Sequence, residues 1–185
     1  MKETYAGVPV IGFAAASGTG KTTLLRAIVS ALATDGLRIG CVKHTHHDFD
    51  IDHPGKDSHT LRGAGACQTL LGSPRRWALM VDEPTPADDD LDGLLSRLDL
   101  ARLDVVLVEG FKLGEYPKIE VRRVELAAPQ LLGQLPAVIA LATNQRPPPA
   151  APVPVFDLDA PAALIAFIRR HLARLHGLQR RRPPA

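Results

Sequence analysis

The sequence predicts an α/β fold with a largely parallel sheet flanked by helices. Two observations carry this prediction. Short apolar runs that end in turn residues alternate along the chain with segments of helical periodicity. Several of these runs are continuously apolar, which is typical of parallel strands that are buried on both faces.

The elements of the first half follow this alternation. An almost wholly apolar run over residues 8–16, closed by turn residues, predicts a buried strand. From Thr22, apolar residues recur at helical spacing, and Gly36 ends the helix. The chain then predicts a strand over 37–42, a long polar loop over 44–58, a short helix over 59–66, and strands over 68–71 and 76–81.

The second half continues the pattern around one continuous apolar strand, expected over residues 104–108. Residues 118–124 alternate apolar and charged side chains, which predicts a half-exposed strand. The remaining elements are a helix over 91–98, strands over 137–142 and 155–158, and an amphipathic helix over 160–175. We expect a single domain over residues 1–178 and a disordered basic tail over 179–185.

Composition narrows the class of protein. The chain has 185 residues, 45% of them hydrophobic, which suffices for one core. A net charge of +2 and an aromatic content of 4% favour neither nucleic acid nor a membrane as partner. Cys41 and Cys67 have no metal-site spacing and are expected to be buried in a reducing compartment. The first apolar run is too short to span a bilayer, so a cytoplasmic location is expected.

The segment between the first strand and the first helix carries a phosphate-binding motif. Residues 15–22 read Ala-Ala-Ser-Gly-Thr-Gly-Lys-Thr, which matches G-x-x-x-x-G-K-[ST] except for Ala15 at the first position. Glycines let backbone N–H groups turn toward an anion, and the helix start adds more donors. This P-loop predicts a nucleoside triphosphate site and the three-layer fold of P-loop NTPases. Its expected nucleotide-binding residues are Ser17, Gly18, Thr19, Gly20, Lys21, Thr22 and Thr23.

Two further roles follow from the P-loop chemistry. Lys21 is expected to reach the β- and γ-phosphates, and the Thr22 hydroxyl to ligate Mg²⁺. The apolar strand over 104–108 ends in Glu109, which is expected to hold the magnesium shell or a water. Lys21 and Glu109 are therefore the candidate catalytic residues. Asp104, at the other end of that strand, is expected to be structural.

The polar loop after the second strand is dense in histidine and aspartate. P-loop proteins often place a γ-phosphate-sensing segment here, so a nucleotide- or substrate-facing loop is favoured. A solvated loop and a transition-metal site remain open, although no His-x₃-His or Cys-x₂-Cys spacing supports the latter. The candidate residues are His44, Thr45, His46, His47, Asp48 and Asp50.

The sequence gives less information about the nucleotide base. Ala142-Thr143-Asn144 follows a late strand, where many GTP-binding folds read guanine. The N-K-x-D motif is absent, so guanine selectivity does not follow from these residues. No arginine or glutamine is clearly placed to stabilise a transition state, so slow turnover is expected.

Several segments together resemble the molybdopterin-guanine dinucleotide biosynthesis adapter (MobB) family. They are residues 13–25 with the P-loop, 43–48 (Lys-His-Thr-His-His-Asp), 54–58 (Pro-Gly-Lys-Asp-Ser), 76–80 (Arg-Trp-Ala-Leu-Met) and 108–112 (Val-Glu-Gly-Phe-Lys). The resemblance covers most of the chain to about Val124. It implies a homodimeric, GTP- and Mg²⁺-binding protein with weak GTPase activity. It also implies that the protein assists the molybdopterin guanylyltransferase and contacts other molybdenum cofactor proteins.

Two other classes of protein share the P-loop. A small-molecule or nucleoside kinase commonly carries an arginine-rich lid, which this sequence lacks. A nickel or zinc metallochaperone GTPase would use the histidine-rich loop to hold its metal.

Overall fold

The computed structural model describes residues 1–45, 49–83, 90–126, 131–146 and 148–180. It confirms the predicted α/β fold, with strands and helices close to the expected ranges. Two compact units are distinguished, one built from Met1–His44 and Asp90–Ala185 and the other from Thr45–Asp89. The single domain over residues 1–178 stays a prediction.

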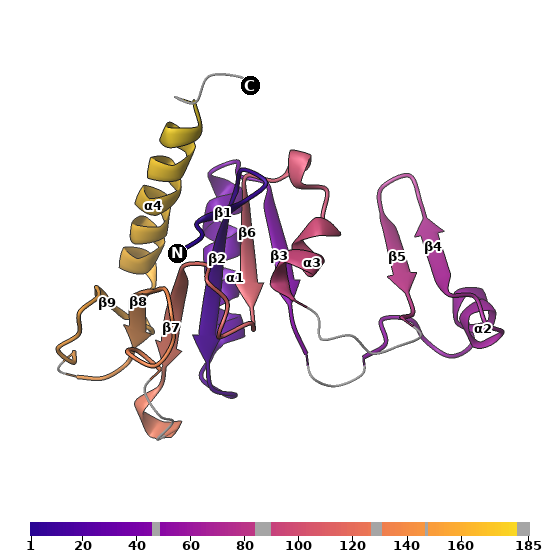
Figure 1. The fold of residues 1–185 in the computed structure, drawn as a ribbon. Helices are drawn as coiled ribbons and strands as arrows, with labels where there is room; N and C mark the ends of the chain where they lie inside the picture. The colour runs from indigo at the N-terminus through magenta and orange to yellow at the C-terminus, as the bar shows by residue number, and fades with distance from the viewer. Residues whose placement is uncertain (46–48, 84–89, 127–130, 147, 181–185) are drawn as a thin grey trace. The chain divides into compact units, whose positions relative to one another are not determined.

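A parallel sheet forms the centre of the first unit (Figure 1). Short β1 (Thr4–Tyr5) pairs antiparallel with the start of the second strand. Because the other six strands run the same way, their carboxyl ends share one edge, where ligands bind in open α/β sheets. In spatial order these strands are β3 (Ile39–Lys43), β6 (Val105–Glu109), β2 (Val8–Ala15), β7 (Lys118–Arg122), β8 (Val138–Thr143) and β9 (Val155–Asp157).

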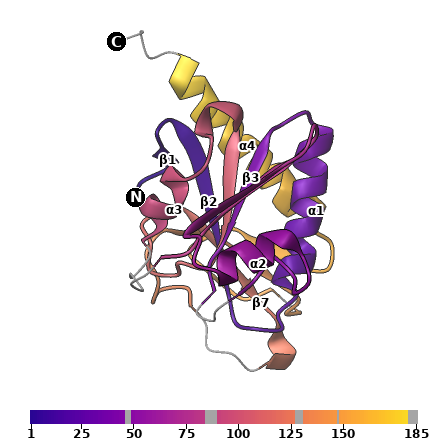
Figure 2. The ribbon, with the colours of Figure 1, turned by 90° about the vertical axis from the view of Figure 1, so that its right-hand side faces the viewer.

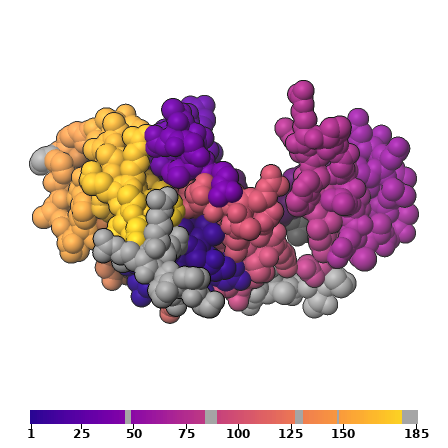
Figure 3. Space-filling view, turned by 90° about the horizontal axis from the view of Figure 1, so that it is seen from above, coloured from indigo at the N-terminus to yellow at the C-terminus, as the bar shows by residue number. Residues whose placement is uncertain are grey.

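Helices cover both faces of this sheet and complete three layers (Figure 2). Helices α1 (Lys21–Thr34) and α4 (Ala162–Arg180) pack on one face, and α3 (Leu91–Ser96) packs on the other. In the space-filling view, α4 lies against the segment that carries β8 and β9 (Figure 3). The apolar side chains predicted for the two long helices are in the core; they include Leu24, Ile28, Leu32, Leu164, Ile168 and Leu172. Short 3₁₀ helices, η1 and η2, span Leu100–Arg102 and Val124–Leu126.

Strand β7 differs most from its prediction, because it is buried rather than half-exposed. It lies between β2 and β8, and Lys118 and Glu120 are only 3% and 1% exposed. Lys118 Nζ donates to the carbonyl oxygens of Gly114 (2.5 Å), Tyr116 (3.1 Å) and Pro136 (2.8 Å). Glu120 Oε1 accepts from the backbone N–H of Leu131 at 2.9 Å. Backbone groups thus replace water around the Lys118 ammonium and at one of the two Glu120 oxygens, while Glu120 Oε2 is buried without a hydrogen-bond partner among the described residues.

Two smaller expectations are also corrected. Helix α4 continues to Arg180, so Gln179 and Arg180 are helical instead of belonging to the tail. The rest of the predicted tail, residues 181–185, lies outside the described residues. Cys41 and Cys67 are both exposed, against the expectation of burial.

Asp104 is structural, as expected, at the amino end of β6. Its carboxylate accepts from the Arg38 side chain at 2.9 and 3.0 Å and from the Arg38 backbone N–H at 2.7 Å. These bonds lower the pKa of Asp104 to about 2. A depressed carboxyl pKa stabilises the fold above the unfolded-state pKa, and this contribution is lost as the pH falls through the folded-state value.

We therefore expect Asp104→Asn to lower the free energy of unfolding by about 1 kcal/mol at neutral pH, since the pair is partly exposed. The difference from the parent should shrink as the pH falls from 4 toward 2. Urea unfolding at several pH values measures it, with Asp99→Asn as a control at an exposed aspartate nearby. If the difference in the free energy of unfolding stayed constant over this pH range, the stabilisation would not come from the ionised Asp104 carboxylate.

The second unit consists of a short helix and a hairpin. Helix α2 (Asp57–Gly63) precedes strands β4 (Gln68–Gly72) and β5 (Trp77–Val81), which pair as a two-stranded antiparallel sheet. The unit exposes several large apolar side chains: Phe49, Ile51, Leu61, Leu70, Leu71, Trp77, Leu79 and Val81. Across the described part of the chain, no helix combines the length and apolar character needed to cross a membrane.

Candidate functional site

The P-loop connects the carboxyl end of β2 to the first turn of α1. Gly18 and Gly20 have φ values of 78° and 87°, in the left-handed region that glycine adopts without strain. Gly20 is the N-cap residue of α1 and offers no side-chain cap for the N–H groups of the first turn. Uncapped N–H groups at the start of a long helix suit an anion. The loop thus has the backbone form that a phosphate cradle needs.

Thr19 stabilises the loop from within. Its side chain is buried, and its hydroxyl donates to the Ala16 carbonyl oxygen at 3.1 Å. Ser17, Thr22 and Thr23 are exposed around it. Thr22 lies in the first turn of α1, so its hydroxyl is accessible to a ligand of the P-loop.

The two predicted catalytic residues meet at this edge of the sheet. Lys21 Nζ lies 3.3 Å from Glu109 Oε1, and both side chains are less than a fifth exposed. They meet because β6 pairs directly with β2, with Phe13 opposite Glu109 in the register. A cation and a carboxylate therefore lie side by side at the P-loop.

The turn after Glu109 is fixed by a close backbone approach. Gly110 has a φ of 112°, and a Cβ atom there would lie 2.8 Å from the Cβ of His44. His44 donates its backbone N–H to the Glu109 carbonyl oxygen at 2.9 Å, and its ring contacts Phe111 at 4.4 Å between centroids. Gly110 thus lets the start of the histidine-rich loop lie directly beside Glu109.

An arginine that the sequence did not single out also contacts the P-loop. Arg123 follows β7, and its Nε donates to the Thr19 carbonyl oxygen at 3.2 Å. Its terminal nitrogen pairs with Asp159 at 3.1 Å. The guanidinium thereby joins the P-loop to the turn between β9 and α4, and it places a second positive charge beside the P-loop.

Comparison with known proteins identifies the family to which the chain belongs. A family model described as molybdopterin guanine dinucleotide synthesis protein B, MobB, matches residues 10–144. The chain belongs to the MobB family. This family assignment confirms the resemblance drawn from the P-loop and the segments around it.

Individual relatives agree with this MobB assignment. The chain is 54% identical over 116 residues to the molybdopterin-guanine dinucleotide biosynthesis adapter protein of Escherichia coli, covering 63% of this chain and 66% of that protein. It is 36% identical over 171 residues to the adapter protein of Haemophilus influenzae, covering 92% and 93%. The MobB homologue from Bacillus stearothermophilus is a similar solved structure, with 26% identity, a TM-score of 0.68, and coverage of 89% and 98%.

The histidine-rich loop of this MobB chain is only partly described. His44 belongs to the first unit, and Thr45 and Asp50 to the second. Within the second unit, Asp50 Oδ1 accepts from Arg62 at 2.8 Å, and this bond holds the pKa of Asp50 below its usual value. His46, His47 and Asp48 lie outside the described residues. An approach of this loop to nucleotide or substrate stays a prediction.

The transition-metal alternative gains no support from the described residues. Among them, no group of three or more histidine, cysteine, aspartate or glutamate side chains lies together as a metal site would require.

Asn144, which follows β8, makes structural contacts. Its Oδ1 accepts from the Val124 backbone N–H at 3.0 Å, and its amide donates to the Glu125 carboxylate.

Proposed function

We propose that this protein is a GTP-binding adapter with weak GTPase activity in molybdopterin guanine dinucleotide biosynthesis. It would assist the guanylyltransferase that attaches GMP to molybdopterin. The observation that carries the nucleotide part is the meeting of Lys21 and Glu109 at 3.3 Å beside an uncapped P-loop. The pathway part is supported by membership of the MobB family and by the similarity to molybdopterin-guanine dinucleotide biosynthesis adapter proteins.

The P-loop residues Ser17 to Thr23 would hold the phosphates through backbone N–H groups and Lys21. The Lys21 ammonium is paired with Glu109 in this structure. A triphosphate offers Lys21 stronger acceptors, which would release the Glu109 carboxylate toward Mg²⁺ together with the Thr22 hydroxyl. Magnesium, when bound, neutralises charge on the β- and γ-phosphate oxygens.

Weak hydrolysis is consistent with the surroundings of Arg123. Its guanidinium is engaged by the Thr19 carbonyl and by Asp159, so it must leave both before it can stabilise charge on a transferring phosphoryl group. This cost favours nucleotide retention over rapid turnover.

A calorimetric titration with non-hydrolysable GTP and ATP analogues, each with and without Mg²⁺, tests the proposal. We expect magnesium-dependent binding of the GTP analogue and much weaker binding of the ATP analogue. Preference for ATP would instead indicate a kinase. Absence of binding to either analogue would contradict the nucleotide assignment altogether.

Glu109→Gln separates the role of the carboxylate from that of the P-loop. The amide keeps the size of the side chain but is a poorer ligand for Mg²⁺. We expect GTP binding to change only a few-fold, while single-turnover hydrolysis slows about tenfold or more. Equal losses in binding and hydrolysis would indicate that Glu109 is structural.

A homodimer is part of the same proposal. The second unit exposes a two-stranded hairpin with large apolar side chains, among them Leu70, Trp77 and Leu79. Such surfaces usually mark contacts with other chains. Sedimentation of the protein and of a Trp77→Ser variant would reveal whether the hairpin contributes to assembly.

The guanylyltransferase and other molybdenum cofactor proteins are the proposed partners, and the cytoplasm is the proposed location. Co-purification of the tagged protein with the guanylyltransferase would support the partner. Cell fractionation would test the location.

A further inference from the structure

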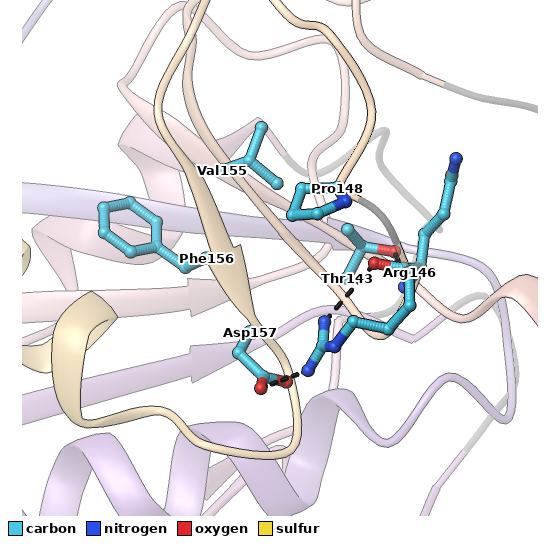
Figure 4. Close-up of a pocket in the computed structure, with 7 residues that line it drawn as sticks. Thr143, Arg146, Pro148, Val155, Phe156 and Asp157 are labelled. Atoms are coloured by element: carbon cyan, nitrogen blue, oxygen red, sulfur yellow. Dashed lines mark hydrogen bonds and ion pairs between the residues drawn. The ribbon is translucent and has the colours of Figure 1, made fainter.

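A pocket of about 260 Å³ opens where β8 and β9 end (Figure 4). Pro148 and Val155 form an apolar wall, and Phe156 points away to the other side of its strand. The polar part of the lining is made by Thr143, Gln145, Arg146 and Asp157. An apolar wall with hydrogen-bonding groups at its margin suits a flat heterocycle, which offers apolar faces and polar edges.

The carboxylate of Asp157 provides a negatively charged hydrogen-bond acceptor in the lining of this pocket. It forms an ion pair with Arg146, and its Oδ1 accepts from the Asp159 backbone N–H at 2.9 Å. Arg146 is more than half exposed, whereas the Asp157 side chain is only 33% exposed. The arginine can therefore swing into solvent and leave the carboxylate facing the pocket.

The pocket and the P-loop share one edge of the sheet. Strand β7 separates β2 from β8, so with a strand spacing of about 4.8 Å the ends of β2 and β8 lie roughly 10 Å apart. Arg123 bridges this interval, because it contacts Thr19 in the P-loop and Asp159 beside the pocket. A ribose and the first phosphates of a nucleotide can span this interval.

We infer that this pocket binds the guanine base of the nucleotide whose phosphates occupy the P-loop, and that Asp157 selects guanine. This inference rests on the proposed function. An ionised carboxylate only accepts hydrogen bonds. Guanine presents two adjacent donors, the N1–H and the 2-amino group, whereas adenine presents a lone pair at N1 and no 2-amino group. Asp157 thus favours guanine and disfavours adenine.

The assignment explains base reading without an N-K-x-D motif after β8. Asn144 is engaged by Val124 and Glu125, so the strand that follows, β9, supplies the acidic group instead. Arg146 occupies the carboxylate until the base displaces it. The exchange keeps Asp157 paired in both states, which avoids leaving a partly buried charge alone.

Removing a donor from the base and the carboxylate from the protein tests this contact. The parent and Asp157→Asn are titrated with non-hydrolysable analogues of GTP and of inosine triphosphate, which lacks only the 2-amino group. We expect the parent to prefer the GTP analogue about tenfold or more, because a hydrogen bond to a charged group is lost with inosine. In the variant this preference should shrink to a few-fold, because the two modifications remove the same contact.

Asp35→Asn is the matched control. Asp35 also pairs with an arginine, Arg169, at 2.7 and 2.9 Å, but it follows the carboxyl end of α1, far along the chain from the pocket. The Asp35→Asn variant should keep the parent's preference for the GTP analogue over the inosine triphosphate analogue. Thermal melts should show that the parent and both variants are folded.

The outcomes separate this inference from the proposed function. Binding of GTP with an inosine discrimination that Asp157→Asn leaves intact overturns the base site alone. An unaltered protein that binds GTP and inosine triphosphate equally also overturns it, without any variant. A parent that binds no triphosphate overturns the proposed function and this inference with it.

Discussion

Replacing Lys21 with alanine should weaken binding of a non-hydrolysable GTP analogue by about 3 kcal/mol or more, roughly a hundredfold in Kd. The lysine is largely buried beside the P-loop and holds one carboxylate already. Its removal deletes a charge-assisted bond to a desolvated phosphate and takes a positive charge away from the P-loop. Both effects act in the same direction, so this is the largest change in affinity that we expect.

Lys2→Ala provides the control for lost positive charge. Lys2 pairs with Asp92 and precedes β1, which joins the amino end of β2, at the opposite edge of the sheet from the P-loop. Calorimetry should find its GTP affinity close to that of the parent. If Lys21→Ala bound the analogue as tightly as Lys2→Ala, the P-loop would not be the phosphate site.

Lys118→Met should produce the largest loss of stability, about 3 to 5 kcal/mol. Methionine matches the apolar stem but donates no hydrogen bond, so the carbonyls of Gly114, Tyr116 and Pro136 lose a common partner. Burial lowers the pKa of Lys118. Its ammonium nevertheless links three backbone carbonyl groups through hydrogen bonds. Urea unfolding followed by circular dichroism measures the loss.

An exposed lysine tests whether the loss at Lys118 reflects its buried contacts. Lys112→Met changes the same side chain in the loop that precedes β7, where it is exposed, and should alter stability by no more than about 0.5 kcal/mol. Similar stabilities for the two variants would mean that the three carbonyls find other partners when the ammonium is absent.

The contrast between Lys21 and Lys118 explains how much of this molecule could be predicted from its sequence. Lys21 stands in a motif whose local conformation depends on neighbouring glycines, so its place at the start of α1 could be predicted. Glu109 ends a continuous apolar run, and that pattern correctly predicted a buried strand whose polar end lies at the carboxyl edge of the sheet. Both predictions use only short-range information.

Strand β7 shows why the burial of some charged residues and the order of the strands could not be predicted. Lys118 and Glu120 alternate with apolar residues as they would on a strand with one wet face, and nothing local reveals that Gly114, Pro136 and Leu131 will cover them. The neighbours of a strand are equally non-local. Without the pairing of β7 with β2, Arg123 cannot be placed at the P-loop, nor can Asp157 be related to it.

The hairpin of the second unit has a consequence for the dynamics of the chain. In a two-stranded antiparallel ladder, alternate backbone N–H groups point outward and have no ladder partner. The side chains of β4 and β5 are mostly exposed, and a two-stranded sheet is marginally stable in water, so the amides of both strands should exchange with deuterium quickly, while those of central β7 should exchange slowly. The rate at which the hairpin takes up deuterium would therefore report, residue by residue, when another chain covers it.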